Sequence, residues 1–170
     1  MEKELKLTVN GEPYELQVKP NTLLVDLLRN ELKLTGTKRG CVSSSCAACT
    51  VLIDGKAVKS CSILALQANG REVTTIEGLA EGDKLHPIQE AFVNHGAIEC
   101  GFCIPGQVMS AKALLDENPN PTKDEITAAM RGHLCACSGY VKIIESIDIA
   151  AKMVRGEEYP RDWDEVKASR

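Results

Sequence analysis

The eight cysteines of this 170-residue chain are the side chains with the clearest capacity for chemistry, and they fall into two sets. The first set has the spacing Cys-x4-Cys-x2-Cys-x11-Cys and comprises Cys41, Cys46, Cys49 and Cys61. Its first three members match the plant-type 2Fe-2S pattern, in which a more distant cysteine completes the site. A 2Fe-2S rhomb needs four converging thiolates, and one irregular loop can supply three of them. The first set therefore predicts a 2Fe-2S centre, whereas structural zinc more often uses two short cysteine pairs.

The second set has the spacing Cys-x2-Cys-x31-Cys-x-Cys and comprises Cys100, Cys103, Cys135 and Cys137. Pro105 follows the first pair, a position where proline suits the first turn of a helix. Two loops at one end of a helical bundle could thus face each other across a metal, and this spacing alone leaves both 2Fe-2S and zinc open. A Rieske centre is excluded because it needs two histidine ligands. The lone histidines His95 and His133 are expected to be surface or cap residues.

Composition and charge exclude several other classes of function. The 20 basic residues are nearly balanced by 24 acidic ones, for a net charge of −4. They form no basic stripe, so we expect no nucleic-acid binding. The N-terminal residues lack the apolar run of a secretion signal, and no stretch approaches the ~18 apolar residues of a membrane span. We therefore expect no membrane span and a cytoplasmic location, where paired cysteines are more often metal ligands than disulfides.

The chain around the first set has the pattern of strands with one helix. Apolar and polar residues alternate on both sides of Asn10-Gly11, which is a strong hairpin signal. In chain order, the expected elements are a hairpin over residues 5–18, a helix over residues 23–36, a hairpin over residues 50–58 and a strand over residues 72–76. These elements predict a small α+β domain over residues 1–80.

The chain around the second set has the pattern of helices. Apolar residues recur at helical spacing in four segments, which begin near Ile88, Val108, Thr122 and Val141. The third segment opens with the capping box Thr122-x-x-Glu125. Short connections between such helices predict a compact four-helix domain over residues 81–156. Residues 157–170 are charged and broken by proline, and we expect them to form a polar tail whose Trp163 anchors on a partner.

The chain resembles the small iron–sulfur subunit of the molybdenum hydroxylases, the family of xanthine dehydrogenase, aldehyde oxidoreductase and carbon monoxide dehydrogenase. The resemblance extends over roughly residues 4–155. Besides the helix near Leu23, it is carried by Lys38-Arg39-Gly40-Cys41, Cys46-Ala47-Ala48-Cys49-Thr50-Val51, Thr75-Ile76-Glu77-Gly78-Leu79, His86-Pro87-Ile88-Gln89, Glu99-Cys100-Gly101-Phe102-Cys103-Ile104-Pro105-Gly106 and Leu134-Cys135-Ala136-Cys137-Ser138-Gly139-Tyr140. The family implies an N-terminal β-grasp 2Fe-2S ferredoxin domain and a C-terminal four-helix 2Fe-2S-binding domain.

The same resemblance implies how the protein works. Each cysteine set would hold one 2Fe-2S cluster, a large partner subunit would hold molybdopterin, and a further subunit would hold FAD. Electrons from substrate oxidation at molybdenum would pass through the helical domain and then the ferredoxin domain to the flavin. Glu99 and Cys137 would face the pterin. The chain itself would carry no catalytic residue.

Five positions depart from the family's usual residues. Glycines are usual at Ser44 and Ala47, glutamine at Glu99, threonine at Ile104 and arginine at Ala136. Two other functions are compatible with the cysteines. A free-standing two-cluster ferredoxin-like carrier would dock transiently to several partners, and a structural zinc protein would be colourless. The second cluster favours the subunit over the free carrier, because a second electron site is useful only between a donor and an acceptor.

Overall fold

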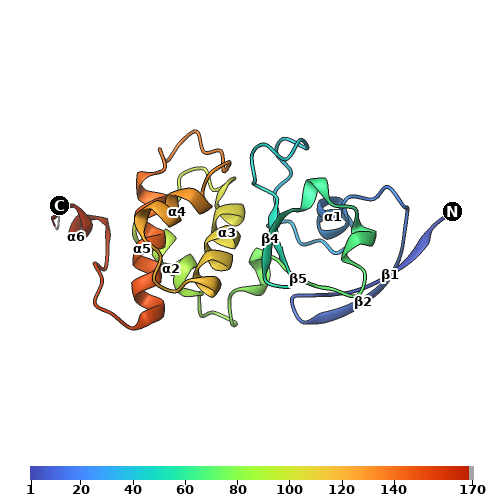
Figure 1. The fold of residues 1–170 in the computed structure, drawn as a ribbon, viewed down its shortest axis with the longest axis horizontal. Helices are drawn as coiled ribbons and strands as arrows, with labels where there is room; N and C mark the ends of the chain where they lie inside the picture. The colour runs from blue at the N-terminus through green and yellow to red at the C-terminus, as the bar shows by residue number, and fades with distance from the viewer. Residues whose placement is uncertain (169–170) are drawn as a thin grey trace.

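The computed structural model describes residues 1–168, which form a strand-rich half and a helical half lying side by side (Figure 1). The strand-rich half contains one five-stranded sheet in the order β2-β1-β5-β3-β4. Its strands are β1 (Lys3–Val9), β2 (Glu12–Val18), β3 (Thr50–Ile53), β4 (Lys56–Lys59) and β5 (Glu72–Thr74). β1 runs antiparallel to β2 and parallel to β5, and β3 runs antiparallel to both β4 and β5.

The two predicted hairpins are confirmed, and their turns explain their register. Asn10 and Gly11 both have positive φ, as do Asp54 and Gly55 at the second turn. Two consecutive residues in this conformation make the tight turn whose twist matches that of paired strands. The last predicted strand ends at Thr74, two residues early, because the chain turns there into a short 3-10 segment.

A short helical segment covers one face of the sheet. It consists of α1 (Leu24–Asp26) and a π-helical turn (Leu27–Glu31), so it ends before the predicted Gly36. Three of its leucines are fully buried against apolar side chains of β1, which alternate inward as strand geometry requires. The segment therefore closes the core of the strand-rich half and brings the chain to the start of the first cysteine loop.

Strand β3 is shared by two hydrophobic cores. Val51 and Ile53 belong to the core of the strand-rich half, whereas Leu52 belongs to the core of the helical half. Both faces of the sheet are therefore covered at this strand. This explains why residues 51–53 are a continuous apolar run and do not alternate with polar residues.

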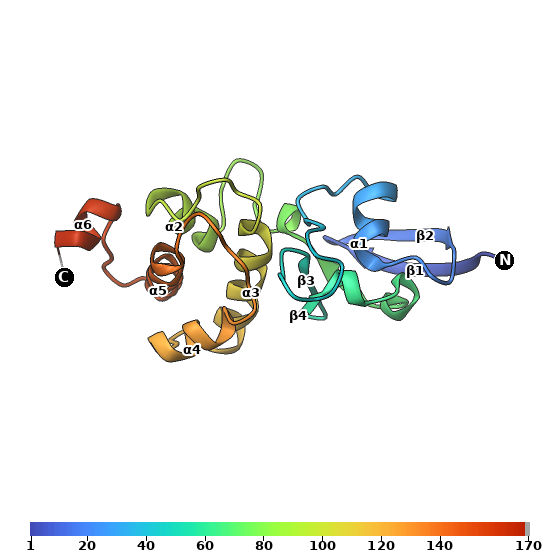
Figure 2. The same ribbon diagram turned by 90° about the horizontal axis from the view of Figure 1, so that it is seen from above.

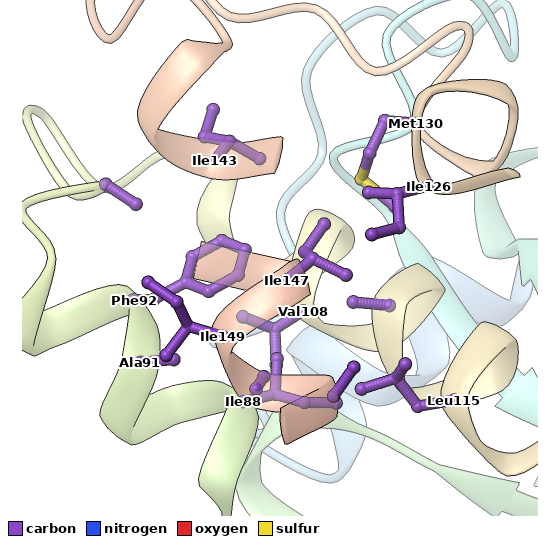
Figure 3. Close-up of a cluster of buried hydrophobic side chains, with 14 of the residues drawn as sticks. Ile88, Ala91, Phe92, Val108, Leu115, Ile126, Met130, Ile143, Ile147 and Ile149 are labelled. Atoms are coloured by element: carbon purple, nitrogen blue, oxygen red, sulfur yellow. The ribbon is translucent and has the colours of Figure 1, made fainter. Parts of the chain in front are cut away.

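The four predicted helices are present and pack around one core (Figure 3). They are α2 (Pro87–Asn94), α3 (Ile104–Glu117), α4 (Lys123–Ala129) and α5 (Val141–Arg155). The expected capping box forms at α4, where Thr122 and Glu125 bond reciprocally. Phe92 and Ile147 are fully buried where α2 meets α5. Within the described residues, no helix combines the length and the apolar character needed to cross a bilayer.

The C-terminal segment, which was expected to be a polar tail, packs beside α5 of its own chain (Figure 2), with Trp163 partly buried there. The segment forms a short sixth helix, α6 (Trp163–Ala168), and Val166 is buried against the helical core. The Nζ atom of Lys142 on α5 lies 5.2 Å from the centre of the Trp163 ring, a cation–π distance. The buried histidine His95 contacts the carbonyl oxygen of Pro160 at 2.7 Å. These contacts hold the segment against the helical half of the same chain, and composition alone could not reveal them.

Candidate metal centres

The first cysteine loop, residues 40–49, has an irregular backbone that curls around its own sulfur atoms. Val42, Ser44 and Ala47 all have positive φ, between 56° and 60°. A non-glycine residue in this conformation costs roughly 1–2 kcal/mol. The loop therefore keeps a left-handed backbone at Ser44 and Ala47, even though neither is the glycine that the family resemblance led us to expect.

The curled loop directs three backbone amides at the sulfur of Cys41. The N–H groups of Ser43, Ser45 and Cys46 donate to Cys41 Sγ at 3.5, 3.3 and 3.3 Å. The bonds from Ser43 and Cys46 lower the pKa of the Cys41 thiol to about 6. Hydrogen bonds to the charged form favour it, so this site is prepared for a thiolate.

The other two thiols of the first set, Cys49 and Cys61, are buried and adjacent. The Ser60 hydroxyl donates to the Cys49 carbonyl at 2.7 Å and ties the start of β3 to the segment that carries Cys61. Ser44 Oγ lies 3.9 Å from Cys61 Sγ. Burial raises the pKa of Cys49 to about 11. A thiolate at such a depth needs a positive partner, and a bound metal supplies one.

The second set gathers where two loops meet at the N-terminal ends of α3 and α5. Cys137 Sγ lies 3.5 Å from Cys100 Sγ and 3.9 Å from Cys135 Sγ. Burial raises the pKa of Cys103 to about 12, with the neighbouring Cys135 thiol as the next cause. Two thiolates on one tetrahedral metal lie about 3.8 Å apart for bonds of about 2.3 Å. The sulfur spacings of this set therefore fit shared metal ligation.

Two neighbouring residues hold Cys135 in place. Its backbone N–H donates to the phenolic oxygen of Tyr140 at 2.9 Å. Burial alone would raise the pKa of the Cys135 thiol, but hydrogen bonds from the side chain and backbone of Ser138 outweigh it and lower the pKa to about 6. Each set thus contains one thiol tuned toward the thiolate and one deeply buried thiol.

Neighbouring sulfurs lie close together in both cysteine sets. Cys137 Sγ is near the sulfurs of both Cys100 and Cys135, and the thiol of Cys49 adjoins that of Cys61. A binuclear cluster takes four thiolates, two on each of two irons, and each set supplies four cysteines.

The two cysteine loops approach each other at one edge of the molecule, near the top of Figure 1. The Leu134 N–H donates to the carbonyl oxygen of Cys46 at 3.1 Å, which joins the loops through their backbones. The Phe102 ring lies against Gly40, within 3.3 Å of where a Cβ on that glycine would stand. Two sites that are far apart in sequence are therefore neighbours in space.

The remaining positions singled out from the sequence have varied surroundings. Glu99 is exposed beside Cys100, and no described residue pairs with its carboxylate. Ala136 is exposed between two thiols of the second set. Ile104 opens α3 and packs on the helical core, while the N-cap position belongs to Cys103. Ile104 therefore does not act as the cap of this helix.

His95 and His133, which were expected to be surface or cap residues, are both buried, and His95 occupies the C-cap position of α2. His95 and His133 are not surface residues, with only 1% and 5% of their surface exposed. His133 Nε2 lies 2.8 Å from the Ser110 hydroxyl, and burial, followed by the charge of Lys59, lowers its pKa to about 4. The sequence does signal burial for His95, which continues the apolar face that Ile88 and Phe92 form. His133 carries no such signal, and its burial comes from the packing of residues 131–134 against α3.

Comparison with known proteins agrees with this geometry. A family model described as "2Fe-2S iron-sulfur cluster binding domain" matches residues 7–80, and a model described as "[2Fe-2S] binding domain" matches residues 75–148. The chain is 45% identical over 148 residues to the nicotinate dehydrogenase small FeS subunit of Eubacterium barkeri, covering 87% of this chain and 94% of that protein. It is 49% identical over 144 residues to the nicotine 6-hydroxylase small subunit of Paenarthrobacter nicotinovorans, covering 85% and 87%.

A solved structure shows the same similarity in three dimensions. Quinoline 2-oxidoreductase from Pseudomonas putida 86 superposes with a TM-score of 0.86 at 43% identity, covering 92% of this chain and 99% of the matched chain. The fold and the paired thiols thus define an electron-transfer protein with two 2Fe-2S clusters. More specifically, the chain belongs to the family of small iron–sulfur subunits of molybdenum hydroxylases.

Proposed function

We propose that this chain is the electron-transfer subunit of a molybdopterin-dependent hydroxylase or dehydrogenase. The observation that carries the proposal is the placement of two thiol quartets near adjoining loops, with neighbouring sulfurs close together within each quartet. We assign the ligands of the two 2Fe-2S clusters to Cys41, Cys46, Cys49 and Cys61, and to Cys100, Cys103, Cys135 and Cys137. When bound, each cluster accepts and releases one electron, and the substrate chemistry belongs to a partner subunit.

The exposure of the thiols supports a direction for the path. Cys100 and Cys137 are exposed, whereas Cys49 and Cys61 are buried. We place the molybdopterin of the large partner subunit against the exposed side of the second set, with Glu99 and Cys137 facing the pterin. The bond between Leu134 and Cys46 then leads toward the first set. From there the electron leaves to an acceptor, for which we propose FAD in a further subunit.

Three further assignments belong to the same proposal. We propose that the strand-rich half is a β-grasp ferredoxin domain, which its mixed sheet with β1 parallel to β5 supports. We place the boundary with the four-helix domain near residue 80, where the two family models meet. We also propose a cytoplasmic location, because none of the eight cysteines forms a disulfide, and thiols of this kind suit a reducing compartment.

Metal analysis and native mass test the proposal together. We expect protein purified in air to be red-brown, to contain about four iron and four acid-labile sulfide per chain, and to elute with a molybdenum-containing subunit. Zinc in place of iron would refute the ligand assignment. A monomer with both clusters, recovered from native extract with no molybdenum in any fraction, would favour a free-standing ferredoxin-like carrier.

A further inference from the structure

Lys59 lies at the junction between the two cysteine loops. It is the last residue of β4 and is half-buried, two positions before Cys61. Its Nζ donates to the carbonyl oxygen of Ser44 at 2.7 Å, in the middle of the first loop. The same Nζ stands 3.6 Å from where a Cβ on Gly132 would be, so it also touches the segment that leads to the second set.

The ammonium group of Lys59 has no neutralising partner nearby. Within the described part of the chain, no carboxylate lies within ion-pair distance of its Nζ. Its Nζ reaches both loops, through the Ser44 carbonyl oxygen on one side and the backbone at Gly132 on the other. A half-buried and unpaired cation is screened less than one at the surface. The positive charge therefore acts on whatever charge the neighbouring sites carry.

We infer that Lys59 is a positioning residue that holds the first cysteine loop in shape and raises the reduction potential of the cluster bound there. The inference rests on the proposed function, because it needs a cluster at the first set. Reduction adds one electron, and a nearby positive charge stabilises the reduced cluster more than the oxidised one. The bond to Ser44 also fixes a carbonyl within a left-handed stretch of backbone.

The size of the effect follows from the contacts. Lys59 Nζ is 2.7 Å from the Ser44 carbonyl, and the hydroxyl of the same serine is 3.9 Å from Cys61 Sγ. The charge therefore lies within about 11 Å of a sulfur of the first set. With an effective dielectric constant of about 20, such a charge shifts a one-electron equilibrium by about tenfold, or about 59 mV. The second set should shift less, because Lys59 Nζ approaches that half at Gly132, outside the second set, and makes no hydrogen bond to a loop that carries its thiols.

The test compares variants at Lys59 in the complete protein with both clusters, using potentiometric titration followed by EPR of each cluster. Lys59→Met removes the charge and the hydrogen bond, Lys59→Arg keeps both, and Lys59→Gln keeps an N–H donor without the charge. Lys56→Met is the matched control, because Lys56 is an exposed lysine on the same strand. We expect both neutral variants to make the first cluster about tenfold harder to reduce. We expect the arginine variant and the control to stay close to the wild type.

Several results would overturn the inference. It fails if Lys59→Met and Lys59→Gln leave the first potential unchanged, or if both potentials shift equally. It also fails if Lys59→Arg shifts the first potential as much as Lys59→Met does. Loss of iron from Lys59→Met but not from Lys59→Arg would support the positioning role. The potential of the first cluster in Lys59→Gln, which keeps an N–H donor without the charge, then shows whether the charge raises that potential. Iron and sulfide analysis of the wild type separates this failure from failure of the proposed function, since a wild type without iron refutes the latter.

Discussion

The substitution Gly106→Ala tests how the two halves of the molecule meet. Gly106 is buried in the first turn of α3, where that helix lies against the first cysteine loop. A Cβ added there would stand 3.0 Å from the Cα of Ala48 and closer still to the carbonyl oxygen of Ala47. Both neighbours are backbone atoms and cannot rotate away. The helix would have to move from the loop by about 1 Å to restore ordinary contact.

Two opposing contributions set the expected magnitude. Alanine is favoured over glycine in a helix by up to about 1 kcal/mol. Overpacking of a well-packed contact costs about 1–3 kcal/mol. We therefore expect a net loss of stability of about 1–2 kcal/mol. At about 2–4 °C per kcal/mol for a chain of this size, the unfolding midpoint should fall by about 2–8 °C.

The assay is thermal unfolding of the cluster-loaded protein at a fixed scan rate, with iron release followed in parallel, since metal loss and unfolding are coupled. Ala113→Gly on the same helix is the control, because it measures helix propensity away from the first loop. A rise in the midpoint for Gly106→Ala, similar in size to the fall for Ala113→Gly, would show that propensity alone operates. The close contact between the halves would then be refuted.

Three other predictions test separate parts of the structure. His86 Nδ1 accepts the Ile88 N–H at the start of α2, and burial followed by the charge of Lys112 lowers the pKa of His86. The folded state therefore loses stability as the pH falls below about 6.5. His86→Asn keeps an acceptor that does not titrate, so it should reduce this loss in acid unfolding curves. Equal pH dependence of stability in both proteins would refute the cap. His95→Leu removes both ring contacts with carbonyl oxygens, so it should cost about 1–3 kcal/mol and speed tryptic cleavage at Arg161. An unchanged cleavage rate would show that His95 does not hold the segment. A carboxylate only accepts hydrogen bonds, whereas an amide also donates them. Glu99→Gln should therefore change molybdenum retention or the reduction rate of the second cluster and leave the first cluster unaltered. If the variant and the wild type have identical molybdenum retention and an identical reduction rate, Glu99 lies away from the pterin.

The errors of sequence reasoning share one physical cause. The C-terminal segment was expected to be exposed because it is polar, and His133 was expected at the surface or at a cap. Their burial depends on surfaces supplied by distant elements, such as the His95 ring at the C-cap of α2 for the carbonyl of Pro160 and the Ser110 hydroxyl for His133. The role of Lys59 was invisible for the same reason, since nothing in a lysine near the end of a strand indicates its bond to Ser44. Tertiary contacts of this kind leave no periodicity in the sequence.

The sequence by itself determined the features that depend on short-range spacing. The number of thiols and their division into two sets were readable, as were the hairpin turns at Asn10-Gly11 and Asp54-Gly55 and the helix faces of α2–α5. The tertiary structure decided which thiols are neighbours, which of them are buried, and that Leu134 bonds to Cys46 across 88 residues of chain. Turn and helix preferences act between neighbours along the chain. The environment of a thiol is set by segments that meet only when strand β3 buries side chains in both cores.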